Sequence, residues 1–113
     1  YVMSNPQAGF TANYPHLLDE QATHIAWIVR AGRDRGATVI EVTPEAEAAW
    51  VQQCIDRARN LNDFFESCTP GYYNNEGKVS ERSVQNGFYG GGSVEFFRIL
   101  ADWRSDGAMQ GLE

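Results

Sequence analysis

The sequence lacks several signatures, and each absence excludes a class of protein. No stretch approaches 18 uninterrupted apolar residues, so we expect no membrane-spanning helix. Neither GxGxxG nor GxxxxGK[ST] occurs, so the chain has no dinucleotide fingerprint and no P-loop of its own. The HExxH and GxSxG patterns are also missing, which argues against a zinc protease and an α/β-hydrolase.

Positive charge and cysteine are both scarce. Nine basic residues face fifteen acidic ones, which gives a net charge of −6. An acidic surface repels phosphate backbones, so we expect no nucleic-acid partner. The two cysteines, Cys54 and Cys68, form no CxxC pair, and a disulfide framework or a metal site needs more ligands. We therefore expect two reduced thiols in a cytoplasmic protein without a metal site.

The length of the chain allows one domain at most, and its ends have the character of strands. The chain has 113 residues, with an apolar start at 1–3 and another strand-like run at 109–112. A strand needs partners, and these two runs have few candidates within the chain. We therefore expect the sequence to be cut from a longer polypeptide.

A long helix is predicted over residues 15–35. Asn13 is suited to cap it, and Pro15 fits the first turn, where its missing N–H costs nothing. Gly36 is a natural residue to follow its end. The predicted buried stripe consists of Leu18, Ala22, Ile25 and Val29, widened by Leu17, Trp27 and Ile28.

Two further helices are predicted. Thr43 caps a helix that begins at Pro44 and runs to about residue 60, with Cys54 on its apolar stripe. Ser93 is predicted to cap a third helix that runs to about residue 105. The long stretch between them, 62–85, is predicted to be irregular.

Short strands are predicted at 1–3, 38–42, 87–89 and 109–112. The fold class is accordingly α+β, as a mostly helical fragment of three helices with short strands. Such strands normally belong to a larger sheet. We therefore expect exposed apolar surface and self-association, for example as a homodimer.

Two features could carry chemistry without forming a catalytic set. Gly90-Gly91-Gly92-Ser93 precedes a helix, as in phosphate-binding loops, but a close approach of two backbones is the favoured interpretation. His16 and His24 are two turns apart on one helix, too far for a shared metal ion, and a structural role is favoured for both.

Aromatic residues concentrate in the predicted loops. Such residues often line a ligand cleft, and they equally often pack loops onto a core, so both roles stay open. The residues concerned are Phe10, Tyr72, Tyr73, Phe88 and Tyr89.

Three segments in order resemble Baeyer–Villiger monooxygenases. The first runs from Asn5-Pro6-Gln7-Ala8-Gly9-Phe10-Thr11-Ala12-Asn13-Tyr14-Pro15 into a helix that carries His24-Ile25-Ala26-Trp27-Ile28. The second is Thr43-Pro44-Glu45-Ala46-Glu47-Ala48-Ala49-Trp50-Val51. The third combines Tyr72-Tyr73-Asn74-Asn75-Glu76-Gly77-Lys78 with Gly87-Phe88-Tyr89-Gly90-Gly91. The similarity spans nearly the whole chain.

The resemblance implies a function and a place in a larger enzyme. Members of the family use FAD and NADPH to insert one oxygen atom of dioxygen beside a ketone. The chain would form the C-terminal part of the FAD-binding domain in a flavoprotein with two dinucleotide-binding domains. By position, the flavin-side residues would be Asn13, Tyr14, Pro15, His16 and Leu17, and the nicotinamide-side residues Asn74, Gly77 and Lys78.

The chain departs from the family pattern in ways that bear on activity. A tryptophan usual near the position of Thr69 is absent, which puts the substrate range in doubt. Both dinucleotide fingerprints are absent too, so we expect no activity from this chain alone. Two alternatives stay open from the residues themselves: a stand-alone helical module that binds a partner protein through aromatic loops, and an inert structural domain.

Overall fold

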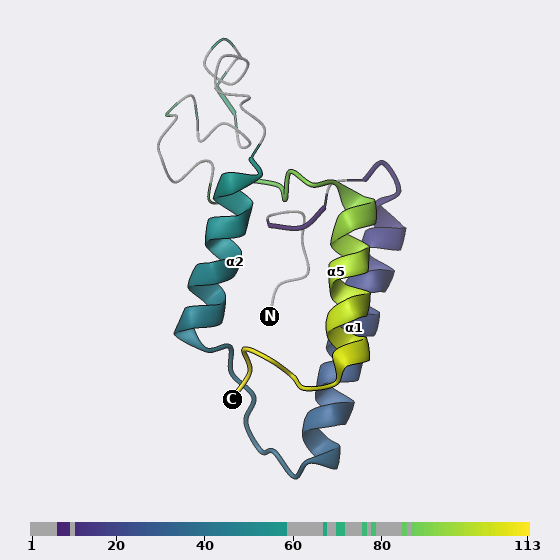
Figure 1. Ribbon diagram of the computed structural model, residues 1–113. Helices are drawn as coiled ribbons and strands as arrows, with labels where there is room; N and C mark the ends of the chain where they lie inside the picture. The colour runs from purple at the N-terminus through teal and green to yellow at the C-terminus, as the bar shows by residue number, and fades with distance from the viewer. Residues whose placement is uncertain are drawn as a thin grey trace.

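The computed structural model describes residues 7–9, 11–58, 67, 70–71, 76, 78, 85 and 87–113. Three helices dominate this part of the chain: α1 (Tyr14–Asp34), α2 (Pro44–Asp56) and α5 (Ser93–Asp106) (Figure 1). The three predicted helices are therefore confirmed. The second ends at Asp56 rather than near residue 60, and most of the stretch 62–85 lies outside the described residues.

Two of the three predicted helix caps are confirmed. The side chain of Asn13 accepts a hydrogen bond from the His16 N–H at 3.2 Å, and Thr43 accepts one from the Ala46 N–H at the same distance. The prediction for Ser93 is wrong, because Gly92 occupies the cap position of α5 without a side-chain bond. Gly92 has a φ of 83°, which suits glycine and disfavours serine there.

The expected mostly helical fragment of three helices is confirmed, but among the described residues the predicted short strands are reduced to two isolated bridges. Gly9 pairs with Tyr89 in parallel, and Val42 pairs with Leu112 in antiparallel orientation. Each predicted strand at 38–42, 87–89 and 109–112 thus contributes one bridging residue, and 1–3 lies outside the described residues. Pairs this short lack the neighbours that make a strand stable.

Helices α1 and α5 pack side by side and run in the same direction (Figure 1). Near their starts, the His16 and Phe97 rings meet with centroids 4.9 Å apart. Near their ends, the Arg35 side chain donates to the Gly107 carbonyl oxygen. Helix α2 stands apart from this pair and is joined to it by the segments at either end (Figure 1).

The buried face of α1 differs from the predicted stripe by about one residue. Val29 is 59% exposed and Ala22 is also exposed, although both were predicted to be buried. Leu17, which the predicted stripe included, is fully buried, and the ring of Trp27, another predicted member, meets the Trp103 ring of α5 as does the unpredicted His24. The apolar pattern failed here because two polar positions, Gln21 and His24, belong to the inward face.

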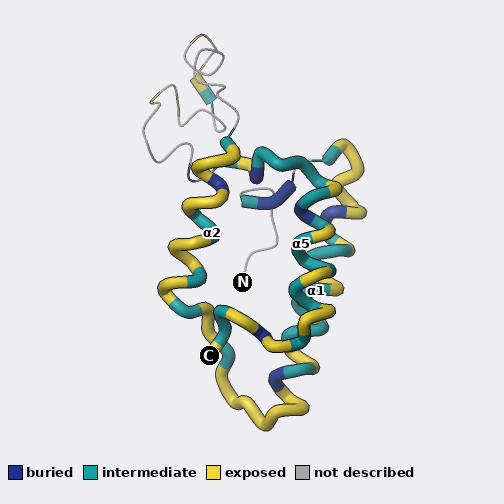
Figure 2. Tube along the Cα trace, viewed as in Figure 1, coloured by how far each residue is buried: buried dark blue, intermediate teal, exposed yellow. Residues whose placement is uncertain are grey.

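The core lies where α2 ends and where α1 and α5 begin (Figure 2). Cys54 is fully buried there, which confirms its predicted core position. Trp50 and three residues of α5 pack against this cluster. The core cluster consists of Ala8, Leu17, Cys54, Tyr89 and Phe96.

Large apolar side chains remain exposed on several elements, as the sequence predicts. Val94 is 71% exposed, Val39 65% and Val29 59%, on α5, on the segment before α2 and on α1. No helix among the described residues is long and apolar enough to cross a membrane.

Candidate functional site

The first turn of α1 is built by a short chain of side-chain caps. The Asn13 N–H donates to the Thr11 hydroxyl at 3.2 Å, and the Asn13 side chain accepts from the His16 N–H. The Leu17 N–H bonds to the Asn13 carbonyl oxygen at 3.3 Å. The Asn13 side chain therefore satisfies one of the amide groups that a helix leaves free at its start, and its carbonyl oxygen accepts the first bond of the helix.

Within the part of the chain that the structure describes, these bonds leave one backbone donor at this turn. Pro15 has no N–H, and the amides of His16 and Leu17 are already used. The Tyr14 N–H donates to no other described residue. A bound group would thus meet one directed N–H together with the positive end of the helix dipole.

The charge around this turn favours a negative or electron-rich group. The first turn of α1 contains no acidic residue. By contrast, α2 begins with Glu45 and Glu47, and α5 has Glu95 in its first turn. Since carboxylates offset the positive end of a helix dipole, α1 is the helix start of the described three that remains open to a ligand.

The five predicted flavin-side residues lie together, and they divide into two groups by exposure. Asn13, Tyr14, Pro15 and His16 are exposed, with Tyr14 at 41%. Leu17 is 0% exposed and belongs to the core, so its side chain supports the turn from beneath. Four of these residues can therefore touch a ligand, and the fifth anchors them.

Of the three predicted nicotinamide-side residues, the structure describes one. Lys78 is exposed. Asn74 and Gly77 lie outside the described residues, as do the loop aromatics Phe10, Tyr72 and Tyr73.

A second polar group joins α2 to α5 and was not singled out from the sequence. The Glu95 carboxylate accepts hydrogen bonds from Arg57 and, at 2.9 Å, from the Tyr89 hydroxyl. The Arg57 guanidinium also lies 5.6 Å from the centre of the Tyr89 ring. Burial and the bond to Glu95 raise the pKa of Tyr89 above its usual value, so the phenol stays protonated and donates.

The glycines beside this group allow close contact between segments, which confirms the favoured interpretation of the Gly90–Gly92 run. A Cβ atom at Gly90 would lie 1.6 Å from the Arg57 carbonyl oxygen. A Cβ atom at Gly91 would lie 2.6 Å from the Tyr89 ring and 2.7 Å from Glu95. Glu95 also places a carboxylate in the turn that a phosphate would need.

A third polar group lies in the seam between α1 and α5. His24 is half-buried against Trp103, and burial followed by the charge of Arg104 lowers the pKa of its imidazole. Arg104 pairs with Glu20 at 3.7 Å. Among the described residues, the buried atoms His24 Nδ1 and Arg104 Nη1 have no hydrogen-bond partner. The seam thus places the imidazole of His24 and the guanidinium of Arg104 near the carboxylate of Glu20.

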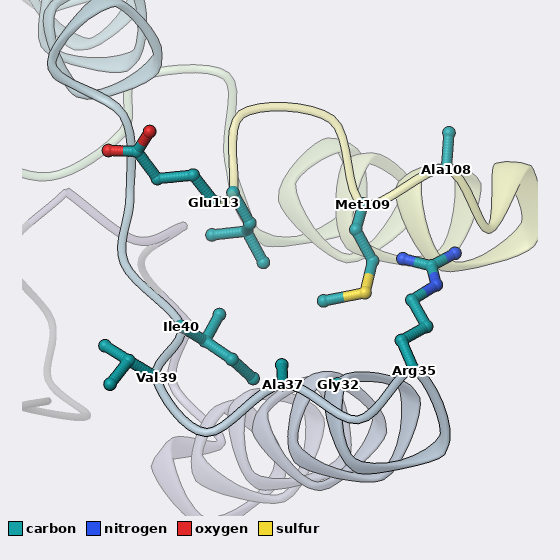
Figure 3. Close-up of a pocket in the computed structure, with 9 residues that line it drawn as sticks. Gly32, Arg35, Ala37, Val39, Ile40, Ala108, Met109 and Glu113 are labelled. Carbon is teal, nitrogen blue, oxygen red and sulfur yellow. The ribbon is translucent and has the colours of Figure 1, made fainter.

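A cavity of about 170 Å³ lies at the opposite end of the helices (Figure 3). Its walls come from the end of α1, the segment before α2 and the last residues of the chain, with Ile40 and Met109 turned toward the space between them. Arg35 lies at its edge and already donates to Gly107. The cavity offers few polar groups to orient a substrate, and no cluster of metal-ligating side chains occurs in the described residues.

Comparison with known proteins connects the geometry to a family. No family model matches the chain. Pentalenolactone D synthase of Streptomyces exfoliatus is 45% identical over all 113 residues, which cover 19% of that protein. A Baeyer–Villiger monooxygenase of Stachybotrys chlorohalonatus is 38% identical over 112 residues, which are 98% of this chain and 18% of that protein. The chain is homologous to one segment of Baeyer–Villiger monooxygenases.

The chain is also similar to a relative whose name states that it binds FAD, and to a solved structure. An FAD-binding monooxygenase of Hypomyces subiculosus is 28% identical over the whole chain, which covers 19% of that protein. The polycyclic ketone monooxygenase of Thermothelomyces thermophila superimposes with a TM-score of 0.79 at 27% identity, over 98% of this chain and 18% of that one. The chain thus spans about a fifth of the Baeyer–Villiger monooxygenases that it matches.

Proposed function

We propose that the chain is part of an FAD- and NADPH-dependent monooxygenase that inserts one oxygen atom of dioxygen into a ketone. The observation that supports this most strongly is the match of all 113 residues of this chain, at 45% identity, to a segment that makes up 19% of pentalenolactone D synthase. The structural likeness to a polycyclic ketone monooxygenase supports the same reaction class. We assign the chain to the C-terminal part of the FAD-binding domain of that larger enzyme.

The first turn of α1 is proposed as the flavin-side contact. Its exposed residues Asn13, Tyr14, Pro15 and His16 would lie against the ring, and buried Leu17 would hold the turn in place. The turn suits this group because it lacks a carboxylate and presents a Tyr14 N–H that donates to no other described residue. The positive end of α1 would stabilise negative charge on reduced flavin. The cofactor itself supplies the oxygen-transfer chemistry when it is bound.

The nicotinamide and substrate side is proposed to involve Asn74, Gly77 and Lys78. Lys78 is exposed at the surface of the chain. The support for this assignment is the ordered resemblance of the Asn-x-x-Gly-Lys segment to the family. We propose NADPH as the electron donor on the same basis.

The isolated chain is proposed to be inactive. It contains no GxGxxG sequence, so the phosphate-bearing halves of both cofactors have no site in it. Its exposed Val29, Val39 and Val94 fit a surface that the remaining four-fifths of the enzyme would cover. A homodimer that covers the same side chains is the alternative for the isolated chain.

The test compares the full-length protein with this chain and uses two matched cap variants. In the full-length protein, Asn13→Ala and Thr43→Ala each remove one helix cap, worth about 1 kcal/mol. Asn13 caps the proposed flavin-side helix, whereas Thr43 caps α2. FAD affinity is measured by titrating the apoprotein, and turnover by NADPH consumption with cyclic ketones.

We expect the full-length protein to bind FAD and to consume NADPH with a ketone, and this chain to do neither. We expect Asn13→Ala to weaken FAD binding and Thr43→Ala to leave it unchanged. A full-length protein without flavin would overturn the proposal and favour the partner-binding module. Equal effects of the two variants would remove α1 from the flavin site while leaving the reaction class in place.

A further inference from the structure

The Glu95 carboxylate connects three segments that are far apart in the sequence. Arg57 follows the last turn of α2, Tyr89 lies in the segment before α5, and Glu95 is in the first turn of α5. One oxygen of Glu95, Oε1, accepts from both the Arg57 guanidinium and the Tyr89 hydroxyl. We name Arg57, Tyr89 and Glu95 the clip.

The clip is held in place by close packing as well as by hydrogen bonds. Tyr89 is 1% exposed, and its ring stacks on Trp50 of α2 with centroids 5.2 Å apart and planes at 18°. Gly90 passes directly against the Arg57 carbonyl group, with no room for a side chain. These contacts fix the Tyr89 ring and the Arg57 backbone beside the Glu95 carboxylate.

The clip lies next to the residues that support the start of α1. Phe96 and Phe97 directly follow Glu95 in the first turn of α5. Phe96 is 5% exposed and shares the core with Leu17, while the Phe97 ring meets the His16 ring edge-on at 4.9 Å. A rotation of this turn of α5 would therefore displace both side chains on which the start of α1 rests.

The ion pair between Arg57 and Glu95 contributes little to the free energy of unfolding. The side chains of Arg57 and Glu95 are 48% and 36% exposed, and pairs with that much exposure add little to the free energy of unfolding. The ion pair contributes little stability, yet together with the Tyr89 hydrogen bond it joins three segments at one oxygen, so the clip is better explained by the geometry that it imposes.

We propose that Glu95 is a positioning residue for the flavin side of the enzyme. By accepting from Arg57 and Tyr89, its carboxylate sets the orientation of the first turn of α5, and Phe96 and Phe97 transmit that orientation to Leu17 and His16. This inference rests on the proposed function, because it takes the first turn of α1 as the flavin contact.

The experiment uses the full-length protein with Glu95→Ala, Glu95→Gln and Tyr89→Phe. Glu95→Gln keeps an oxygen acceptor, and Tyr89→Phe removes a single hydrogen bond while it keeps the ring. The control is Asp34→Asn, which breaks the exposed Arg30–Asp34 pair at the far end of α1. Two quantities are measured: the dissociation constant for FAD, by titration of the apoprotein, and the thermal midpoint of the apoprotein.

We expect Glu95→Ala to raise the dissociation constant for FAD by roughly tenfold, as for residues that act through a packed network. Glu95→Gln should recover part of this loss, Tyr89→Phe should show a smaller loss, and Asp34→Asn none. The thermal midpoint of the apoprotein should change little in all four variants. This pattern would support a positioning role.

Two results would overturn the inference while the proposed function stands. One is an unchanged dissociation constant in Glu95→Ala. The other is a loss of FAD affinity accompanied by a comparable drop in the thermal midpoint, which would make the clip a general structural element. If the unmodified full-length protein binds no FAD, the proposed function fails first, and the inference fails with it.

Discussion

The imidazole of His24 lies edge-on against the indole of Trp103, with ring centroids 5.0 Å apart and planes at 60°. This contact joins α1 to α5 near the middle of their seam. Trp103 also contacts Trp27, at 5.5 Å, and its indole N–H donates to the Gln110 carbonyl oxygen at 3.0 Å. A titratable ring thus sits inside an otherwise aromatic contact.

The free energy of unfolding of the chain should depend on pH because His24 lies in the seam between α1 and α5. Burial and Arg104 lower the pKa of His24 in the folded chain, while in the unfolded chain the pKa stays near 6.5. Below about pH 6.5 the unfolded state therefore binds more protons, so the free energy of unfolding falls as pH drops toward the folded pKa.

Replacing His24 with Gln should flatten this pH dependence between pH 7 and 5. The measurement is urea denaturation at several pH values, with His16→Gln as the matched control because His16 is exposed on the same helix. If His16→Gln flattened the dependence of the free energy of unfolding on pH and His24→Gln did not, the dependence would not arise from His24 in the seam.

The Glu20–Arg104 pair should couple α1 to α5 energetically. Its side chains are 28% and 16% exposed, so the pair is better shielded than Arg30–Asp34, at 79% and 60%. Glu20→Gln should cost about 1–2 kcal/mol, between the exposed and fully buried cases. A double-mutant cycle with Arg104→Met checks this, and we expect the double variant to lose less than the sum of the two single losses. Strict additivity would mean that the pair contributes nothing.

Substitution by alanine should lower the free energy of unfolding by different amounts at Gly90 and Gly36. Gly90→Ala places a Cβ atom 1.6 Å from the Arg57 carbonyl oxygen, so we expect a loss of about 3 kcal/mol. Gly36→Ala meets nothing within 4 Å, but its φ of 75° should cost about 1 kcal/mol. Denaturation midpoints of the two variants test this order, and a larger loss at Gly36 would contradict the close approach at Gly90.

The thiol of Cys54 should react only when the structure opens. It is fully buried, and burial raises its pKa, so little thiolate forms at pH 8. In a Cys68→Ser background, reaction with an aromatic disulfide reagent should be at least about a hundredfold slower in the native chain than in urea. Equal rates in the two conditions would show that the core around Cys54 is open.

Local signals in the sequence predicted the helices well, because capping is local chemistry. Asn13 and Thr43 each bond to an amide three residues away, and a sequence displays that spacing directly. Ser93 failed as a cap because the backbone φ at Gly92, which no side-chain pattern reveals, moved the boundary by one residue.

The candidate site was only partly visible in the sequence. The group Asn13–Leu17 is contiguous, so its shared turn could be predicted, although the burial of Leu17 depends on packing against the core. The clip could not be predicted, because Arg57 and Glu95 are 38 residues apart and meet only in the folded chain.

The sequence by itself determined the three helices, the absence of a nucleotide fingerprint and the resemblance to Baeyer–Villiger monooxygenases, since all of these depend on residue type and on local spacing. The tertiary structure alone decided which face of α1 is buried and which distant side chains share the Glu95 oxygen. Those outcomes depend on how separate segments pack, and packing selects among arrangements that local chemistry leaves equally available.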